Sequence, residues 1–382
     1  MTNTRIGTAL TALTALATLG MLTACGTKGD AGEPQASPVA SPTGTPAASV
    51  SNSPQASPAA TNKPGGAVDL TKLAVGAAPK IAWLEPGTLH TPDGGTLKTT
   101  GELTAVARLG SRWLTVTSLG EQSQITLADR TLKPIKTWRT LDTIVLSDTG
   151  TAAGWFSPKG APMVLSAGKT APITFGTPVK GSAQPVALTG DGCADDMSAE
   201  EGGCTLYYNL TDAKGHSTFK LFNSHGLTDV VATKVLHGSD VHEEGDSVRF
   251  SAMTKVMDEG SCWAVMEGGM EAMKLWNTCN YSLDAFSTDG KYVLAGPAYR
   301  DGMGDGTVAI LNSNTGAKVA QPKVADGAAI VGTRWEDTTH VLAAVLQGTT
   351  WGIVRIGVDG SVELAGPTAQ GDESAFRHLG LN

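Results

Sequence analysis

The stretch AFSTDGKYVLAGPAYRDGMGDGTVAILNSNTGAKV, residues 285–319, decides the fold. Two short apolar runs within it, residues 292–295 and 308–311, are rich in the β-branched and aromatic side chains that favour strands. The polar turn residues 288–290 (TDG) precede the first run, and residues 312–316 (NSNTG) follow the second. Asp, Asn and Gly suit such turns because they tolerate positive φ. One such sheet cannot bury both of its faces, so the stretch predicts one unit of a stacked array.

Weaker copies of the same strand-to-turn corner recur along the chain. They lie near Leu89, Leu127, Leu165, Leu210, Leu311 and Ile356. The gap between the fourth and fifth corners leaves room for one more, near Trp276. Seven corners give a mean period of about 44–45 residues, the length of a propeller blade. The sequence therefore predicts an all-β protein, a β-propeller of seven blades. Six or eight blades are the alternatives, and a pair of β-sandwiches, which would share no such period, is the other architecture.

Two stretches carry a family resemblance. Residues 286–294 (FSTDGKYVL) and residues 335–345 (WEDTTHVLAAV), followed by WGIVR at 351–355, resemble WD-repeat-like and TolB-like propeller blades of secreted actinobacterial lipoproteins. The resemblance implies a propeller over residues 69–382. The G-H and W-D dipeptides that mark true WD repeats do not recur. The resemblance thus implies the propeller shape rather than a eukaryotic type of scaffold.

Residues 1–24 have the pattern of a lipoprotein signal peptide. Arg5 precedes an apolar run over residues 6–22, and the sequence LTAC at 22–25 resembles the bacterial lipobox. The resemblance implies cleavage after Ala24, a diacylglyceryl group on Cys25 and fatty acyl chains such as palmitate. Each buried CH₂ contributes about 0.8 kcal/mol, so two or more chains anchor a domain firmly. We expect an extracytoplasmic protein held on the outer face of the membrane; an ordinary signal peptide and an uncleaved anchor helix are the alternatives.

Residues 25–68 are predicted to form a disordered linker between the lipidated Cys25 and the propeller at 69–382. After Cys25 the composition changes to Pro, Ala, Ser, Thr and Gly, and the pentapeptide PQASP occurs at both 34–38 and 54–58. Without large apolar side chains the segment cannot offset its ordering entropy. Its proline makes it a semi-stiff spacer of roughly 130 Å when fully extended. An O-glycosylated stalk is the alternative.

Charge and motifs narrow the function classes. The formal net charge is −8 and no block of five or more basic residues occurs, which argues against a nucleic-acid partner. No G-x-S-x-G, P-loop, H-E-x-x-H or strand-linked G-x-G-x-x-G motif is present. We therefore predict no catalytic residue and no cofactor, and favour a protein that is not an enzyme. Asp148, Asp289 and Asp337 stand at matched positions in different copies, but turn chemistry accounts for them.

The four remaining cysteines predict disulfides, because the chain is exported and their number is even. Four cysteines allow three connectivities, and local pairing, Cys193–Cys204 and Cys262–Cys279, is favoured. The first pair brackets the acidic loop ADDMSAEEGG, and the second brackets a hairpin that turns near residues 268–269. Closing loops of this size contributes about 3 kcal/mol in the chain-entropy model. A four-cysteine zinc site requires C-x₂₋₄-C spacing, which is absent.

Two stretches are weak metal candidates. His237 and His242 belong to a cluster of metal-capable side chains that we interpret as an exposed acidic loop. Asp301 and Asp305 belong to the sequence DGMGDG, which resembles a calcium loop but lacks the bidentate Glu and the odd-position ligand series. We predict no metal site.

Three functions remain open. We favour a cell-surface lipoprotein whose propeller is a non-enzymatic binding or scaffold domain, a monomer that takes a protein, peptide or glycan in the cell wall. The alternatives are a secreted hydrolase or lyase acting on glycan or peptide at the channel, and an accessory lipoprotein of a transport or envelope-assembly machine. We expect any site to lie in the loops that interrupt the repeat, around residues 190–203 and 237–246.

Overall fold

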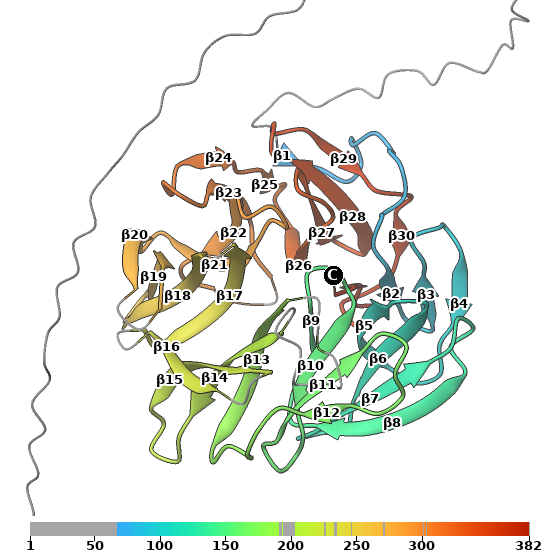
Figure 1. Ribbon diagram of the computed structural model, residues 1–382. Coiled ribbons are helices and arrows are strands. Elements are labelled where there is room, and N and C mark those ends of the chain that lie inside the picture. The colour runs from blue at the N-terminus through green and yellow to red at the C-terminus, as the bar shows by residue number, and fades with distance from the viewer. Residues whose placement is uncertain are drawn as a thin grey trace, which may run out of the picture. The chain divides into compact units, whose positions relative to one another are not determined.

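The chain folds as a ring of seven sheets around a central channel (Figure 1). The computed structural model describes residues 67–190, 193, 203–224, 227–232, 235–245, 247–269, 272–300, 302 and 304–381. All of these residues belong to one compact unit, residues 57–382. The prediction of an all-β protein with seven blades is confirmed, and the pair of β-sandwiches is excluded.

Each blade is a sheet of four antiparallel strands, which run in order from the channel to the outside of the ring. Blades 1 to 4 consist of β31 (His378–Leu379), β2 (Trp83–Glu85), β3 (Thr88–His90) and β4 (Thr96–Lys98); β5 (Leu103–Leu109), β6 (Arg112–Ser118), β7 (Ser123–Ala128) and β8 (Pro134–Thr140); β9 (Val145–Leu146), β10 (Ala152–Phe156), β11 (Pro162–Ser166) and β12 (Ile173–Thr174); β13 (Ser182–Thr189), β14 (Thr205–Thr211), β15 (Ser217–Asn223) and β16 (Thr228–Ala232). Blades 5 to 7 consist of β17 (His237–Glu244), β18 (Ser247–Met257), β19 (Gly260–Glu267) and β20 (Met273–Thr278); β21 (Tyr281–Phe286), β22 (Tyr292–Pro297), β23 (Ala309–Asn312) and β24 (Lys318–Ala320); β26 (Ala328–Trp335), β27 (His340–Gln347), β28 (Thr350–Gly357) and β29 (Val362–Leu364), with β30 (Ala369–Gln370) also paired to β28.

The turn chemistry of the deciding stretch is confirmed in blade 6. The turn from β21 to β22 closes through a hydrogen bond from the Gly290 N–H to the Ser287 carbonyl, 2.7 Å long. Gly290 and Gly316 both have positive φ, 66° and 69°, in the two turns that the sequence predicts. Asp289 supports the first turn by accepting from the Ser287 hydroxyl at 2.8 Å.

Two of the seven predicted corners are misplaced. Five of them lie in the third strand of a blade, as the repeat requires, but Leu210 lies in the second strand of blade 4 and Trp276 in the fourth strand of blade 5. The hairpins on both sides of a strand use the same turn residues, so composition alone does not tell one corner from the next. The mean period still holds, since six steps from the end of β3 to the end of β28 average about 44–45 residues.

The blades are held together by apolar side chains between them. Among the described residues, each pair of neighbouring blades shares one buried cluster; between blades 2 and 3, for example, Leu114 and Leu127 pack with Trp155. Burying an apolar side chain of this size contributes about 1.5–3 kcal/mol. The cluster between blades 7 and 1 has the fewest fully buried members, namely Ile81, Leu342, Ile353 and Ala365. The junction that closes the ring therefore has the smallest apolar core.

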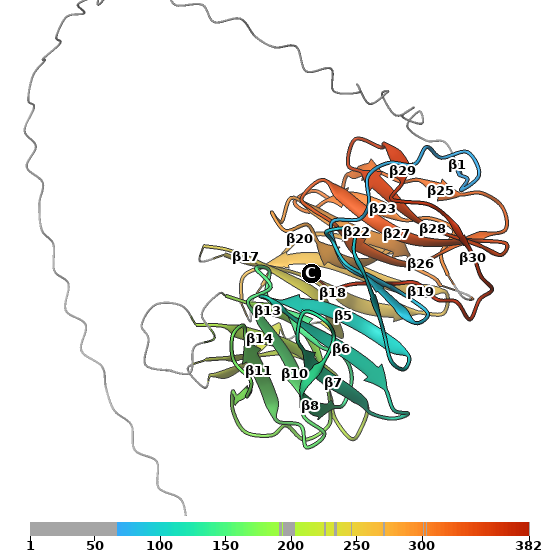
Figure 2. The same cartoon turned by 90° about the vertical axis from the view of Figure 1, so that its right-hand side faces the viewer.

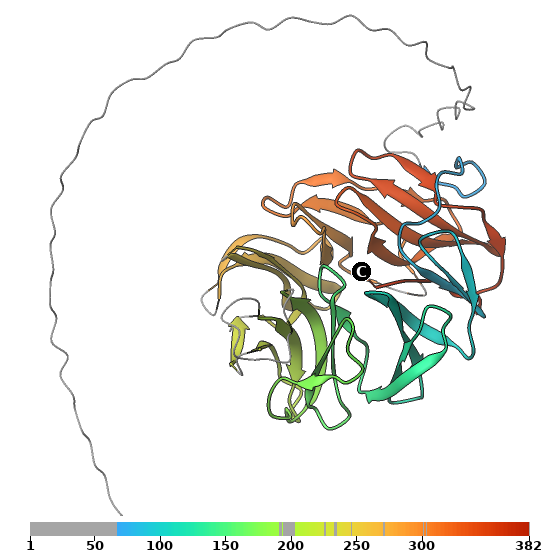
Figure 3. The same cartoon turned by 45° about the vertical axis from the view of Figure 1, so that its right-hand side comes forward.

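Both ends of the folded chain add strand pairs to the ring, the carboxyl-terminal end in blade 1 and the other end beside blades 6 and 7. The carboxyl-terminal strand β31 pairs with β2 and supplies the inner strand of blade 1, so that the two ends of the colour scale lie side by side in Figure 3. At the other end, β1 (Ala67–Val68) pairs in parallel with β25 (Lys323–Val324), and Figure 2 places β1 beside it. We call residues 67–80 the N-terminal strap. Composition assigned its first two residues to the linker, but Val68 is buried against blade 7.

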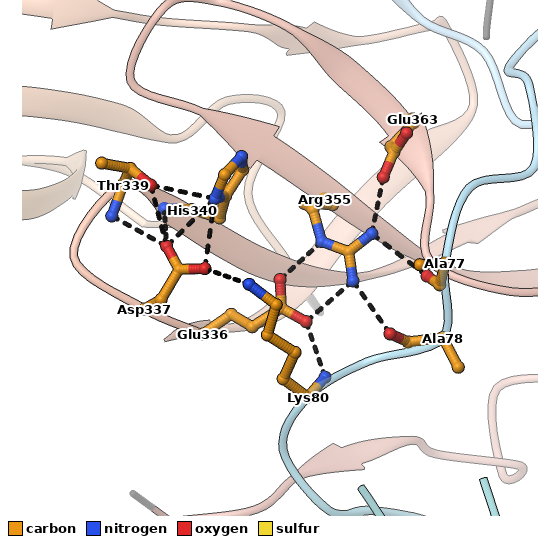
Figure 4. Close-up of polar contacts among 9 residues, drawn as sticks. All are labelled: Ala77, Ala78, Lys80, Glu336, Asp337, Thr339, His340, Arg355 and Glu363. Carbon is orange, nitrogen blue, oxygen red and sulfur yellow. Dashed lines mark hydrogen bonds and ion pairs between the residues drawn. The ribbon is translucent and has the colours of Figure 1, made fainter. Parts of the chain in front are cut away.

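The strap is fastened to blade 7 by a buried ion cluster around Arg355 (Figure 4). All five guanidinium N–H donors are used. Nε and Nη2 donate to the two carboxylate oxygens of Glu336 at 2.5 and 2.8 Å, and Nη1 donates to Glu363 at 2.5 Å. The other two donors bind the strap carbonyls of Ala77 and Ala78, at 3.1 and 3.0 Å. We call this arrangement the Arg355 clasp.

The charges of the clasp stabilise one another. Burial raises the pKa of Glu336, but the hydrogen bonds from Arg355 and from the Lys80 backbone N–H outweigh it, so the pKa is lowered. The hydrogen bonds that Arg355 donates to Glu336, and then to Glu363, raise the pKa of Arg355 despite its burial. Beside them the Lys80 ammonium binds Asp337 at 2.6 Å on the surface. The buried pair thus stays charged and holds the strap to the blade.

The structure pairs Cys193 with Cys204 and Cys262 with Cys279, as the sequence predicts. The second pair joins β19 to the segment after β20. These two strands are paired antiparallel, and residues 268–269 lie between them, where the sequence predicts the hairpin turn. Residues 1–66, which include the predicted signal peptide, Cys25 and most of the predicted linker, lie outside the described residues. In the part of the chain that is described, no helix has the length and apolar character needed to cross a membrane.

Candidate ligand-binding channel

A cavity of about 450 Å³ lies where the innermost strands of the blades converge. Its wall comes from β9, β13, β17, β21 and β26, the first strands of blades 3 to 7, and from Leu381 next to β31. Such a channel brings side chains from distant parts of the sequence to one place, because each blade contributes a strand to it. Ligand pockets in proteins occupy roughly 300–1,000 Å³, so the cavity is large enough to hold a ligand.

Three carboxylates from different blades line the channel. Asp148 follows β9 in blade 3, Asp240 lies on β17 in blade 5, and Asp284 lies on β21 in blade 6. Asp240 is half-buried, and its Oδ2 accepts a hydrogen bond from the Phe286 N–H at 2.7 Å. Burial raises the pKa of Asp240 to about 7, against the N–H donors of Phe286 and Val241, and the charges of Asp148 and Asp284 raise it further. The lining of the channel thus contains three carboxyl groups and one guanidinium.

One guanidinium lines the cavity together with these carboxylates. Arg334 lies on β26 and lines the same cavity, and its Nε is buried without a hydrogen-bond partner. A buried donor without an acceptor costs about 1–3 kcal/mol. His242, 8% exposed, lies on β17 and packs its ring against Phe286 at a centroid distance of 6.4 Å. The channel thus offers several acceptors for a cation and one donor for a polar oxygen.

Sequence reasoning located part of this site and misread part of it. Residues 237–244 were interpreted as an exposed acidic loop, which is wrong: they form strand β17, and His242 is buried. The segment nevertheless supplies Asp240 to the channel. All three aspartates predicted to serve turns do lie in turns: Asp289 and Asp337 accept turn hydrogen bonds, and Asp148 lies in the turn that the Gly150 N–H closes on the Ser147 carbonyl. Asp148 also lines the channel, which the sequence does not predict.

The weak metal candidates are dispersed. The Nε2 atom of His237 lies 3.2 Å from the Asn209 amide nitrogen, and burial lowers the pKa of His237. Asp305 lies 3.4 Å from the Arg300 guanidinium, while Asp301 is outside the described residues. Within the described ranges, no group of three or more His, Cys, Asp or Glu side chains is placed to hold a metal ion. Residues 191–192 and 194–202 of the other expected loop also lie outside them.

Seven four-stranded sheets around a lined channel make this chain a β-propeller protein. No protein-family model matches the sequence, and no curated protein matches it.

Several solved structures are similar to it. The β-propeller domain of Cps50 (Swd1) from Myceliophteria thermophila is 12% identical with a TM-score of 0.45, over 80% of this chain and 97% of that one. Putative TolB from Agrobacterium tumefaciens is 13% identical with a TM-score of 0.40, over 64% and 92%. An oligogalacturonate lyase in complex with manganese is 14% identical with a TM-score of 0.43, over 75% and 83%. Likeness at this level carries no argument about ligand or activity, so function is argued from the site.

Proposed function

We propose that this protein is a cell-surface lipoprotein, anchored to the outer face of the membrane through Cys25, whose propeller is a non-enzymatic binding domain. Its ligand is a cationic peptide segment that enters the central channel. The observation that carries this proposal is the charge of the channel, whose described lining contains Asp148, Asp240 and Asp284 from three blades and one guanidinium, that of Arg334.

The chemistry of the channel selects both parts of such a ligand. A Lys or Arg side chain brings positive charge to the three carboxylates, and charge-assisted hydrogen bonds to carboxylates are the strongest that side chains make. A peptide carbonyl beside it supplies the acceptor that the Nε of Arg334 is missing. The flanking Phe286 and Trp335, both almost fully buried, give the wall an apolar part.

Calorimetric titration of the full-length protein with pentalysine, and separately with pentaglutamate, tests the proposal. We expect saturable binding of pentalysine only, weakening as salt is added. Replacing two of the carboxylates, Asp148→Asn with Asp284→Asn, should weaken binding by about tenfold or more, equivalent to about 1.4 kcal/mol. A control pair in the exposed turn between β18 and β19, Asp258→Asn with Glu259→Gln, also removes two charges and should bind like the wild type.

Four results would contradict the proposal. Equal binding of both peptides, or equal loss in the control pair, would mean that the channel is not the site. Saturable cleavage of a peptide or glycan would overturn the non-enzymatic function. For the anchor, Cys25→Ala should release the protein into the medium, and continued membrane retention would refute lipidation at Cys25.

A further inference from the structure

A second cavity, of about 320 Å³, lies at the junction of blades 7 and 1. It shares no lining residue with the channel. Much of its wall is apolar or small, with Ile353, Ala365 and Pro367 from blade 7 and Gly94 and Gly95 from the turn of blade 1. Its volume is at the lower end of the range for ligand pockets. We call it the junction pocket.

The buried side chain of Arg377 lines this pocket, and its guanidinium has fewer hydrogen-bond acceptors among the described residues than it has donors. Arg377, immediately before β31, is 6% exposed and lines the pocket. Its guanidinium donates one hydrogen bond, from Nη2 to the Oε2 of Glu85, at 3.2 Å. A guanidinium carries five N–H donors, so the other four have no acceptor among the described residues. Burial lowers the pKa of Arg377, although the charge of Glu85 opposes this, and an arginine stays charged at neutral pH.

The surrounding side chains hold this guanidinium in a fixed place. Its Cζ lies over the Trp83 ring at 5.0 Å, and the ring of His90 stacks on Trp83 at a centroid distance of 3.6 Å and an angle of 4°. Glu85, two residues along β2 from Trp83, lies 2.9 Å from the Nε2 of His90 and also binds Arg377. Despite this short distance, the buried His90 nitrogen forms no hydrogen bond of good geometry with any described residue. The guanidinium of Arg377 is therefore held in position before any ligand binds, while most of its N–H donors have no acceptor among the described residues.

We propose that the junction pocket binds a small monocarboxylate, a single carboxylate group on a compact apolar body. Its two oxygens would accept from the unused donors of Arg377, the bidentate geometry that a guanidinium favours. The apolar body would lie against Ile353 and Pro367. Glu85 already supplies one negative charge, which disfavours a dianion such as a phosphate monoester. The proposal goes beyond the function proposed for the channel and does not depend on it.

N-acetyl-alanyl-alanine with a free carboxylate is a suitable probe, and its carboxyl-terminal amide is the matched control. Both are titrated into the full-length protein by calorimetry, with tryptophan fluorescence as a second readout. We expect saturable binding of the acid and at least about tenfold weaker binding of the amide, the ratio expected from the loss of one ionic partner.

Three variants test whether the guanidinium of Arg377 is the group that holds the carboxylate. Arg377→Gln should weaken binding of the acid by about tenfold or more, whereas Arg334→Gln, which removes the guanidinium of the channel, should leave it unchanged. Glu85→Gln should tighten it, because the competing carboxylate is gone and Arg377 then has only the ligand to pair with. A purely structural Glu85 would not produce tighter binding. This third variant also decides the matter if Arg377→Gln does not fold.

Any of four results would overturn the proposal. With the wild type, these are the absence of saturable binding of the acid at millimolar concentration, and equal binding of the acid and the amide. With the variants, they are binding that survives Arg377→Gln in a cooperatively folded protein, and binding that Glu85→Gln weakens or leaves unchanged. If the wild type binds the acid but not pentalysine, only the function proposed for the channel is contradicted.

Discussion

Arg355 and Arg377 are both buried near the junction of blades 7 and 1, with 7% and 6% of their surfaces exposed, yet they are held in opposite ways. Arg355 uses all five of its donors on protein acceptors, whereas Arg377 uses one. Their main carboxylate partners differ as well: the side chain of Glu336 is fully buried, and that of Glu85 is 29% exposed. The same residue type therefore serves as a fastening in one place and as a binding group in the other.

The two arginines differ in what they contribute to the region around the junction. The junction has the smallest apolar core in the ring, and beside it the Arg355 clasp joins the strap to β28 and to Glu336, which follows β26. The clasp also fixes Ala78, which is part of the wall of the junction pocket. A complete ion cluster thus supports a neighbouring incomplete one, and stability and binding are assigned to different side chains.

The largest expected effect comes from breaking the clasp. Arg355→Met leaves the carboxylate of Glu336 buried and unpaired, so we expect the free energy of unfolding to fall by about 3–5 kcal/mol in urea denaturation. Adding Glu336→Leu removes the orphaned charge and should restore much of the loss, because an apolar pair can replace a buried ion pair. A loss below about 1 kcal/mol for the single variant would show that the clasp is not a fastening.

The second-largest effect concerns Asp240 in the channel. Unlike Glu336, which pairs with Arg355, Asp240 forms no ion pair with any described residue. The pKa of Asp240 is raised from 3.8 to about 7, with Asp148, Asp284, His242 and Arg334 around it. Its contribution to stability is therefore complete below about pH 4 and is lost as the pH rises through about 7. At about 1.4 kcal/mol per pKa unit, a rise of about three units gives at most about 4 kcal/mol, and partial exposure of the carboxyl group to solvent reduces this to roughly 2–4 kcal/mol.

Urea denaturation of the wild type and of Asp240→Asn between pH 4 and pH 8 measures this contribution. As the pH rises, the wild type should lose roughly 2–4 kcal/mol of its free energy of unfolding relative to the variant, which cannot titrate at this position. A difference between the two proteins that stays constant over this range would mean that Asp240 titrates normally.

A smaller loss is expected when the incomplete arginine is removed. Arg377→Met gives up one charge-assisted hydrogen bond and a contact with Trp83, but it also removes a buried charge with few partners, and Glu85 remains partly solvated. We expect the free energy of unfolding to fall by no more than about 1.5 kcal/mol. If the loss equals that of Arg355→Met, the two arginines are both fastenings and the contrast fails.

The smallest effect belongs to the surface part of the clasp. Lys80→Ala removes the bond between the Lys80 ammonium and Asp337 but keeps the backbone bond from Lys80 to Glu336. The ammonium group belongs to a side chain that is 63% exposed, so the loss should be about 0.5 kcal/mol and should shrink at high salt. A loss comparable to that of Arg355→Met, independent of salt, would place the strength of the clasp at the surface.

The fold could be predicted because its signals are local. Blade 6 shows its strands and turns within residues 285–319, and copies at a mean period of about 44–45 residues define the ring. The misplaced corners at Leu210 and Trp276 show the limit, since neighbouring hairpins use the same residues. The local cysteine pairs were found for the same reason, because each closes a short loop.

The sites were harder to predict because they join distant residues. Arg377 and Glu85 are 292 positions apart, and neither belongs to a motif. One signal was available: a closed ring must pair its last strand with its first blade, which brings the residues before β31 next to Trp83. Asp148 does lie in the predicted turn, but only the inner position of β9 shows that it also lines the channel.

Nuclear magnetic resonance of the arginine side chains tests the contrast between Arg355 and Arg377 most directly. In the ¹⁵N-labelled full-length protein, assigned by substitution of each arginine, the Nη protons of Arg355 should exchange slowly with water and those of Arg377 quickly. Adding N-acetyl-alanyl-alanine should slow and shift the Arg377 signals and leave those of Arg355 in place. Equal protection of the two guanidinium groups before the addition, or Arg377 signals that do not respond to the acid, would contradict the account.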